Sequence, residues 1–378
     1  MIESEIYMQL KFTVPCLFGL EGLVADELRR LGHDDVKAEN GRVLFSGFEC
    51  DIAKANINLR TGERVLLTVG ETPANSFDEL FEGVRKLPWE DFIPKDGEFP
   101  VKGHSLGSKL HSIPDCQRIV KKAIVERLKS GHKTETLAET GEKYQVQFAI
   151  MSDIATLYID TSGTGLHKRG YRPAQSAAPL RETLAAAIVK LSRYRGKEQV
   201  IDPFCGSGTI PIEAALAALN RAPGLNRSFS AEKWDWVDKK IWADAKKEAK
   251  NREFSGKYDI IGTDIDKKCV EIARENAKRA GVAEHIRFEV ADATAFEANE
   301  SERSTIIMTN PPYGERVMEQ REVEALYRGF GKAVGKDTDF KMYILSSHPE
   351  FEQFFGKRAK KKRKLYNGMI KCDLYMYF

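Results

Sequence analysis

The segment QVIDPFCGSGTIPIEAALAAL, residues 199–219, constrains the fold of this chain more than any other. Its first residues predict a strand that ends near Ile201, and the residues from Thr209 onward predict a helix. Between them, Gly206 and Gly208 allow a tight turn and the close approach of a ligand to the backbone. The amides at the start of such a helix favour a bound anion, either a phosphate or a carboxylate. This order of elements predicts a nucleotide-type binding loop.

The loop differs from the two common phosphate-binding loops. It lacks the GxxxxGK[ST] pattern, and Pro211 occupies the position of the last glycine in GxGxxG. A ligand with a carboxylate is therefore an alternative to a phosphate, and S-adenosylmethionine carries such a carboxylate. A glycine turn that binds no ligand is another interpretation of a pattern this short.

Strand-like and helix-like segments alternate through the chain after this loop. The strand-like segments are YDIIGTDI, IRFEVADA, TIIMTN and KMYILSS. Their alternation with helices predicts an α/β domain with a parallel, doubly wound sheet. The C-terminal segment KLYNGMIKCDLYMYF predicts two strands joined at Asn367-Gly368. Ligands in open α/β sheets bind at the carboxyl ends of the strands, so functional side chains are expected at that edge.

Two acidic residues end consecutive strand-like segments at that edge. Asp264 can accept hydrogen bonds from both hydroxyls of a ribose. It follows Gly206 by 264 − 206 = 58 residues, a longer spacing than the usual ~20. Asp292 can accept a hydrogen bond from an adenine amino group. A helix cap or a turn residue is an equally good interpretation of each aspartate taken alone.

A turn of unusual composition follows the apolar run TIIMT, namely Asn310, Pro311, Pro312 and Tyr313. Neither proline donates a backbone hydrogen bond, so the strand ends there in a stiff turn. The Asn310 side-chain oxygen and the Pro311 carbonyl can accept hydrogen bonds from a planar amine, and Tyr313 offers a flat face for stacking. Accepting both amine hydrogens localises the lone pair, which can then attack a sulfonium methyl. The alternative is a rigid proline turn with a packed tyrosine.

The N-terminal half predicts two small α+β units. Residues 1–66 alternate strand-like segments with two helix candidates, and residues 67–162 contain strands, two helices and a hairpin. A glycine-containing linker follows, and the α/β domain occupies residues 163–378.

Composition limits the class of protein further. Hydrophobic residues make up 42% and charged residues 30% of the 378 residues, which suits a soluble globular protein. No apolar run approaches the roughly 20 residues that span a bilayer, and the acidic N-terminus is a poor signal peptide. The six cysteines form no CxxC pair, which predicts reduced thiols in a cytoplasmic protein and no metal site.

Two basic segments are candidate contacts for phosphates. The segment GKRAKKKRK, residues 356–364, is densely basic, and residues 109–129 mix basic residues into a helical pattern. Such clusters can neutralise a nucleic-acid backbone. A solvated surface with no partner is an equally good interpretation of each.

The motifs DPFCGSGTIPIE and TNPPYG together resemble the S-adenosylmethionine-dependent methyltransferases that modify amino groups. The segments LHKRGYR, APLRETLAAAI and SKLHSIPDCQRIVKKAI resemble THUMP-domain RNA methyltransferases, and above all the bacterial 23S rRNA guanine 2-amino methyltransferases. The resemblance covers nearly the whole chain. It implies a ferredoxin-like subdomain in residues 1–66, a THUMP RNA-binding domain in residues 67–162, and a Rossmann-like methyltransferase domain in residues 163–378.

The resemblance also implies roles for individual residues. The residues implied at the methionine end of S-adenosylmethionine are Asp202, Cys205, Gly206, Ser207 and Gly208. Asp264 would hold the ribose, and Asp292 the adenine. The residues implied at the target base are Asn310, Pro311 and Tyr313. The segment from Pro179 to Thr183 would close over the cofactor, and the residues implied to contact cofactor or RNA are Arg169, Tyr171 and Arg172.

The implied reaction is methylation of the exocyclic 2-amino group of a guanine in 23S rRNA. The alternatives are the same chemistry on tRNA, the 6-amino group of adenine in DNA, a protein glutamine amide, and a non-enzymatic RNA-binding assembly factor. The intact glycine loop and Asn310 argue against the last of these. One interpretation of the long insertion between Gly208 and Asp264 is an added RNA-facing helix.

Overall fold

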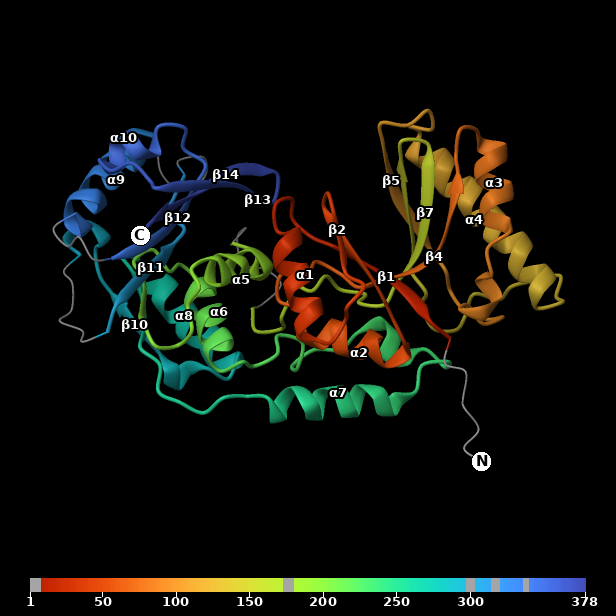
Figure 1. The fold of residues 1–378 in the computed structure, drawn as a ribbon, viewed down its shortest axis with the longest axis horizontal. Coiled ribbons are helices and arrows are strands. Elements are labelled where there is room, and N and C mark those ends of the chain that lie inside the picture. Colours follow the sequence, from red (N-terminus) through yellow and green to blue (C-terminus); the bar gives the residue numbers. More distant parts are fainter. Residues whose placement is uncertain (1–7, 173–179, 297–302, 314–319, 336–339) are drawn as a thin grey trace.

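The computed structural model describes residues 8–172, 180–296, 303–313, 320–335 and 340–378 of the chain. Within these residues the chain forms two seven-stranded sheets, one in each half of the sequence (Figure 1). Among the described residues, no helix is long and apolar enough to cross a membrane.

The first sheet has the strand order β2-β3-β1-β4-β7-β6-β5. Its strands are β1 Leu10–Pro15, β2 Lys37–Glu39, β3 Arg42–Gly47, β4 Leu66–Pro73, β5 Val101–Leu106, β6 Val146–Met151 and β7 Ile154–Asp160. The helices of this half are α1 Glu21–Arg30, α2 Glu49–Asn58, α3 Phe77–Arg85, the short 3-10 helix η1 Trp89–Asp91 and α4 Ile113–Gly131. Ser76 caps α3 by accepting a hydrogen bond from the Glu79 amide.

Strand β4 joins the two N-terminal units into one sheet. It pairs with β1 through Leu66 and Leu67, and with β7 from Leu66 to Pro73. The boundary expected at residue 66 therefore falls on the first residue of a strand that both units share. Hydrophobic residues of both units also belong to one continuous core.

The second sheet has the strand order β10-β9-β8-β11-β12-β14-β13. Its strands are β8 Gln199–Asp202, β9 Ile260–Asp264, β10 Ile286–Val290, β11 Thr305–Thr309, β12 Lys341–Ser346, β13 Lys361–Asn367 and β14 Ile370–Tyr377. The helices are α5 Glu182–Leu191, α6 Thr209–Ala218, α7 Lys239–Asn251, α8 Lys267–Arg279, α9 Gln320–Val334 and α10 Phe351–Phe355, with 3-10 helices η2 Ser230–Lys233, η3 Ala283–His285 and η4 Ala293–Ala295. Strands β10, β9, β8, β11 and β12 are parallel, and β14 and β13 are antiparallel.

Hydrophobic cores cover both faces of this second sheet. Ile306 of β11 belongs to the core that α5, α6 and α8 cover, and its neighbour Ile307 belongs to the core beneath α9 and α10. This alternation follows from the strand period of two. The expected fold, a doubly wound α/β domain preceded by α+β domains, is confirmed.

The expected C-terminal hairpin is also confirmed, with a difference in its turn. Asn367 pairs with Ile370, so the central turn residues are Gly368 and Met369, not Asn367 and Gly368. Gly368 has a φ of +65°, a conformation that glycine adopts without strain.

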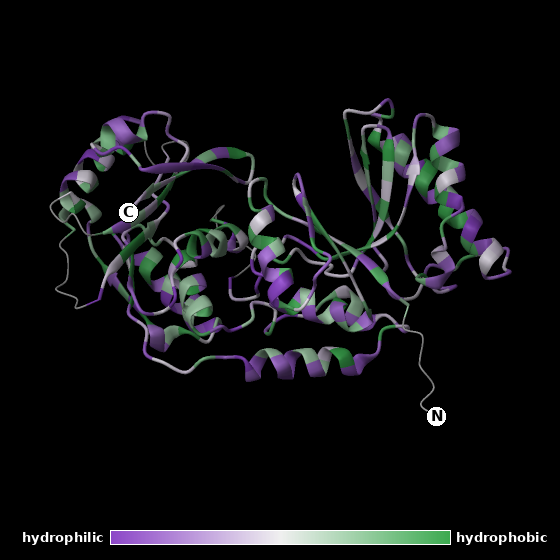
Figure 2. Ribbon diagram, in the orientation of Figure 1, coloured by the Kyte–Doolittle hydropathy of each residue, from purple (hydrophilic) through white to green (hydrophobic). Residues whose placement is uncertain are grey.

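The insertion between the glycine loop and Asp264 packs on the N-terminal half. Helix α7 lies along α2 (Figure 1), and Figure 2 shows hydrophilic and hydrophobic residues alternating along α7. Trp234 is buried, stacks on Tyr144 with ring centroids 4.8 Å apart, and donates a hydrogen bond to the Lys143 carbonyl at 3.1 Å. The insertion therefore fastens the two halves together, a role that the interpretation as an RNA-facing helix did not include.

Candidate active site

The glycine loop lies between β8 and α6, at the carboxyl edge of the parallel sheet. Gly206 has a φ of +50°, and a Cβ added there would meet nothing within 4 Å. Gly208 has a φ of +81°, and a Cβ there would lie 3.0 Å from the Phe288 ring. Gly208 thus permits the helix to pack closely, whereas Gly206 borders open space in which a ligand can approach the backbone.

The two residues beside these glycines are held by hydrogen bonds of their backbone groups to neighbouring elements. The Ser207 carbonyl accepts a hydrogen bond from Asn276 at 3.0 Å, and the Cys205 amide donates to the Thr263 carbonyl at 2.8 Å. The Cys205 side chain is buried, and burial raises the pKa of its thiol. Cys205 is therefore a neutral packing residue in the wall of the loop and not a nucleophile.

Asp202 connects the glycine loop to the Asn-Pro-Pro-Tyr turn. Its Oδ1 accepts a hydrogen bond of 2.6 Å from the Thr309 hydroxyl, and Thr309 directly precedes Asn310. Burial raises the pKa of Asp202 to about 7, although the bond from Thr309 acts in the opposite direction. The ends of β8 and β11 are neighbours in the sheet, so this short contact fixes the turn relative to the loop.

Asp264 supports the glycine loop from the end of β9. Its Oδ2 accepts a hydrogen bond from the Gly206 amide at 2.9 Å, and its Oδ1 accepts one from the Asp266 amide at 3.0 Å. Each carboxylate oxygen has a second lone pair, so these bonds still allow the carboxylate to accept from ribose hydroxyls.

Asp292 caps the 3-10 helix η4 at the end of β10. Its Oδ1 accepts hydrogen bonds from the amide and the hydroxyl of Thr294, both at 2.8 Å. Asp292 therefore acts as a helix cap in the structure, and a contact with adenine would be an additional role.

Two apolar side chains near these aspartates were not singled out from the sequence. Ile265 is 71% exposed and directly follows Asp264, and Val290 is 53% exposed and lies two residues before Asp292. Val290 is also the register partner of Asp264 across β9 and β10. Exposed apolar side chains beside hydrogen-bond acceptors suit a flat, partly apolar ring such as adenine. The sequence signal was an aliphatic residue at each strand end, a pattern too common to stand out.

Asn310 and Tyr313 contact each other in the turn after β11. The Tyr313 hydroxyl donates a short hydrogen bond to Asn310 Oδ1, and Cys372 Sγ of β14 lies 3.7 Å from the same hydroxyl. The Pro312 carbonyl accepts from the Tyr327 hydroxyl at 2.7 Å, which anchors the turn on α9. Burial raises the pKa of Tyr313 well above its ordinary value, so its hydroxyl keeps the proton that it donates. Pro311 is buried at the base of the turn.

The residues at the start of α5 and just before it contact other parts of the chain. Thr183 is buried, and its hydroxyl donates a 2.6 Å hydrogen bond to Glu63 Oε1 of the N-terminal half. Pro179 lies outside the described residues. Arg172 pairs with the Glu182 carboxylate and donates to the Thr209 hydroxyl at 3.2 Å, so it braces the start of α6 next to the glycine loop.

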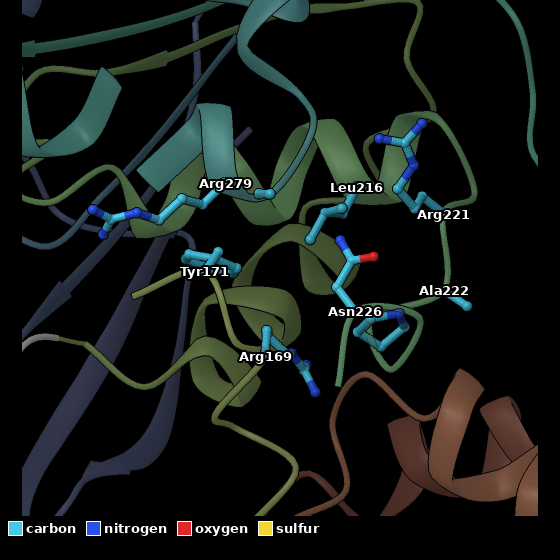
Figure 3. Close-up of a pocket in the computed structure, with 9 residues that line it drawn as sticks. Arg169, Tyr171, Leu216, Arg221, Ala222, Asn226 and Arg279 are labelled. Atoms are coloured by element: carbon cyan, nitrogen blue, oxygen red, sulfur yellow. The ribbon is translucent and has the colours of Figure 1, made fainter. Parts of the chain in front are cut away.

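Arg169 and Tyr171 lie away from the glycine loop. They line a small pocket with Leu216 and Arg221, near the opposite end of α6 (Figure 3). Arg169 is buried and donates to the carbonyls of Leu166 and Arg60. Arg169 therefore serves the contact between the two halves of the chain, whereas the Tyr171 hydroxyl donates to Glu213 Oε1 of α6 at 3.2 Å. None of the residues expected at the methionine end, the ribose or the adenine of the cofactor lines this pocket.

The features at the carboxyl edge of the sheet fit S-adenosylmethionine. The uncapped start of α6 and the open side of Gly206 suit its methionine end, Asp264 suits its ribose, and the exposed apolar pair Ile265 and Val290 suits its adenine. In the part of the chain that the structure describes, no group of three or more His, Cys, Asp or Glu could hold a metal ion. A doubly wound sheet with this loop and an Asn-Pro-Pro-Tyr turn at its carboxyl edge defines a methyltransferase that uses S-adenosylmethionine.

The comparisons with known proteins identify the family. Three family models match the chain: an RlmL ferredoxin-like domain over residues 11–66, a THUMP domain over residues 74–160, and an RMKL-like methyltransferase domain over residues 169–376. The chain therefore belongs to the RMKL-like methyltransferases that carry ferredoxin-like and THUMP domains. The resemblance noted in the sequence is confirmed, and S-adenosylmethionine is the cofactor.

Individual relatives agree with this assignment. The chain is 46% identical over 363 residues to a protein of Bacillus subtilis named "Putative RNA methyltransferase YpsC", covering 95% of this chain and 94% of the relative. It is 35% identical to "Ribosomal RNA large subunit methyltransferase K/L" of Psychromonas ingrahamii over 97% of this chain, but spans only 50% of that relative. A solved structure titled as a putative methyltransferase complexed with SAH (S-adenosylhomocysteine) is 40% identical, has a TM-score of 0.91, and matches over 98% of both chains.

Proposed function

We propose that this protein transfers a methyl group from S-adenosylmethionine to the 2-amino group of a guanine in 23S rRNA. The observation that carries the proposal is the short contact between Thr309 and Asp202, which holds the Asn-Pro-Pro-Tyr turn beside the glycine loop. An acceptor for an amine and a loop for the methyl donor are thereby fixed next to each other, and positioning of this kind is the main source of rate in such transfers.

The proposed cofactor site consists of the loop and the strand ends around it. Its residues are Asp202, Cys205, Gly206, Ser207 and Gly208 at the methionine end, Asp264 at the ribose and Asp292 at the adenine, with Thr183 nearby in α5. When bound, S-adenosylmethionine supplies an electrophilic methyl group on a positively charged sulfur. A positive charge bound near the buried Asp202 carboxyl would favour its ionised form.

Asn310 is the proposed catalytic residue that contacts the target guanine. Its Oδ1 already accepts from the Tyr313 hydroxyl and has a second lone pair for one hydrogen of the guanine amine. The Pro311 carbonyl would accept the other hydrogen. Both bonds pull the nitrogen lone pair out of conjugation with the ring, so that the nitrogen can form the new bond to carbon and release its proton afterwards. The Tyr313 ring would pack on the flat base.

RNA as the acceptor is supported by the family and by the surface of the molecule. The chain carries a THUMP domain, and the K/L relatives are named as ribosomal RNA methyltransferases. Lys360, Lys361 and Lys364 lie exposed on or beside β13, on the same hairpin whose Cys372 contacts Tyr313. We propose that residues 67–162 hold the RNA and that residues 163–378 carry out the transfer, with residues 1–66 between them in the shared sheet.

The test uses methyl-labelled S-adenosylmethionine with three acceptors: unmodified 23S rRNA, unmodified tRNA and DNA. Each product is digested to nucleosides and analysed by mass spectrometry. Label in 2-methylguanosine from 23S rRNA alone is the expected result. Label in tRNA would move the substrate but keep the chemistry, and label in 6-methyladenine of DNA would overturn the proposed base. No label with any acceptor, despite measured cofactor binding, would favour a binding role.

A further inference from the structure

The tip of the β13–β14 hairpin exposes a large apolar side chain near the proposed base site. Met369 is 97% exposed, more than any other large hydrophobic residue that the structure describes. It occupies the second central position of the turn, after Gly368. A tight turn gains nothing from an apolar side chain in water at this position, where small polar residues are the usual choice. Single exposed apolar residues are common on protein surfaces, so the position of this one must carry the argument.

That position is coupled to the Asn-Pro-Pro-Tyr turn by direct contacts. Asn367, the last residue before the hairpin turn, lies close enough to Tyr313 to lower the pKa of its hydroxyl, against the larger rise that burial causes. Cys372, in the other strand of the hairpin, donates to the Tyr313 hydroxyl at 3.7 Å. Ile370 packs partly buried against the same core as Tyr313. The hairpin therefore contacts the residue that bonds to Asn310 through β14, and the last residue of β13 lies near it.

The hairpin is also braced from the N-terminal half. Arg363 of β13 donates a hydrogen bond to the Gly19 carbonyl, in the loop before α1. Figure 1 shows β13 at the centre of the molecule, between its own sheet and α1. The stem of the hairpin is thus held on two sides, at Arg363 by the Gly19 carbonyl and at Cys372 by Tyr313.

The flanks of the hairpin carry positive charge. Lys364 and Lys371 are exposed on the two strands nearer the tip, and Lys361 is exposed at the far end of β13. Such a hairpin suits a nucleic-acid helix. The exposed lysines can contact the phosphates on its outside, and the apolar tip can contact the stacked bases inside. A membrane or a protein partner would not account for the contact between this hairpin and the amine-binding turn.

We infer that the β13–β14 hairpin is a wedge for RNA, in which Met369 enters the base stack where the target guanine leaves it. The inference rests on the proposed function and extends it to how the base reaches Asn310. A base inside a helix must be extruded at a cost of a few kcal/mol, and an apolar side chain inserted into the gap offsets part of that cost. Lys364 and Lys371 would hold the flanking phosphates while the stem keeps the tip beside Tyr313.

The test compares Met369→Ala with the wild type on two RNA acceptors, once the methylated position has been mapped. One acceptor is a fragment in which the target guanine is stacked in a helix, and the other is the same fragment with the opposite strand deleted around the target. Met369→Ala is expected to lower kcat/KM about tenfold on the stacked target and by less than about twofold on the unpaired one. Met369→Leu, which keeps an apolar side chain, should retain most of the activity on both.

The control is Phe254→Ala, which removes another exposed apolar side chain, next to Leu219 at the far end of α6. It should leave both acceptors unaffected. A second measurement places 2-aminopurine beside the target and follows its fluorescence on binding. The wild type should unstack it, giving a rise that Met369→Ala lacks.

The outcomes separate the wedge from the proposed function. If the wild type methylates the stacked guanine and Met369→Ala does so equally well, or loses equal activity on both acceptors, the wedge is wrong and the proposed function stands. If the wild type forms no 2-methylguanosine in any RNA, the proposed function is wrong and the wedge falls with it.

Discussion

Asn310 and Tyr313 form a hydrogen-bonded pair at the centre of the proposed site. The bond from the Tyr313 hydroxyl fixes the orientation of the Asn310 amide, with its oxygen held by a donor that burial keeps protonated. The pair is attached to the rest of the fold through the Pro312 carbonyl on Tyr327 and the Thr309 hydroxyl on Asp202. The proposed acceptor for the amine is therefore positioned before any base binds.

Replacing Asn310 should abolish methyl transfer and leave the affinity for the cofactor nearly unchanged. Asn310→Ala deletes the side-chain acceptor, and we expect kcat/KM for RNA to fall about 100-fold or more, because one polar contact to the reacting group is lost. The cofactor affinity, measured by titration calorimetry, should change little. Tyr313→Phe keeps the ring but not the orienting bond, and should cost less than Asn310→Ala. A comparable loss of cofactor affinity in Asn310→Ala would contradict the role given to this residue.

The buried carboxyl of Asp202 makes the stability of the protein depend on pH. Its pKa is raised from an ordinary 3.8 to about 7 by burial. The folded protein therefore keeps a proton that the unfolded chain has lost between about pH 4 and pH 7. Because the folded state binds more protons in this window, the free energy of unfolding falls as pH rises through it. The loss amounts to about 4 kcal/mol at most, at 1.36 kcal/mol per pKa unit.

Asp202→Asn removes this titration and keeps an oxygen for the Thr309 hydroxyl. In the ligand-free protein we expect the variant to gain stability relative to the wild type as the pH rises from 5 to 8. Thermal unfolding at the two pH values measures the gain. Asp292→Asn, at an exposed capping position, is the control and should show no such trend. A wild-type-minus-variant difference that is equal at pH 5 and pH 8 would show that Asp202 is not held neutral.

At the scale of elements, the basic segment before and within β13 contains side chains that bond within the protein and side chains that lie exposed to solvent. Arg363 donates to the Gly19 carbonyl, and Lys362 pairs with Glu352 at 2.7 Å. Lys361 and Lys364 lie exposed on the same strand. Neutralising the whole segment would mix loss of packing with loss of phosphate contacts, so only the exposed pair gives a clean test.

The double variant Lys361→Gln/Lys364→Gln should bind RNA more weakly and with a lower salt dependence. Each lost phosphate contact reduces the slope of log affinity against log salt by about one, so the expected change is about two. Binding measured between 50 and 200 mM salt gives the slope. Lys240→Gln/Lys250→Gln, exposed on α7, is the matched control. If both pairs change the slope equally, β13 is only part of a general basic surface.

At the scale of the whole molecule, partly buried polar contacts join the two halves. Arg60 is partly buried and donates to the Arg221 carbonyl at 2.8 Å, while Lys190 of α5 pairs with Glu27 of α1 at 3.1 Å. Thr183 bonds to Glu63 in the same region. Helix α5 is therefore fastened to the N-terminal half, which fixes the proposed RNA-binding units relative to the proposed site of transfer.

Gly224 tests this contact by sterics. A Cβ there would lie 2.6 Å from the Ile57 Cα and 2.9 Å from the Asn56 carbonyl oxygen, and backbone cannot move aside as a side chain can. Gly224→Ala should therefore destabilise the protein by about 1–3 kcal/mol. Gly22→Ala is the matched control in α1, where a Cβ meets nothing within 4 Å, and it should stabilise by about 0.5–1 kcal/mol. Thermal unfolding of both variants measures the effect, and an unchanged Gly224→Ala would show that the contact is loose.

Much of the fold was predictable because its signals are local. Glycine's freedom at positive φ, proline's missing amide and the alternation of apolar residues act within a few residues, so the loop at Gly206, the turn at Pro311 and the doubly wound sheet could all be read directly. The β4 strand shows the limit, because its pairing with both β1 and β7 depends on residues far away in the chain.

The sequence by itself determined which chemical groups stand at strand ends: a glycine loop, two aspartates and an amide followed by prolines. Only the tertiary structure decided what those groups contact. In the folded chain, Thr183 bonds to Glu63 and Thr309 bonds to Asp202. Asp292 caps a 3-10 helix, and Trp234 is buried against the N-terminal half. The physical reason is that a side chain's chemistry is fixed by its covalent structure, whereas its partner depends on the packing of segments distant in sequence.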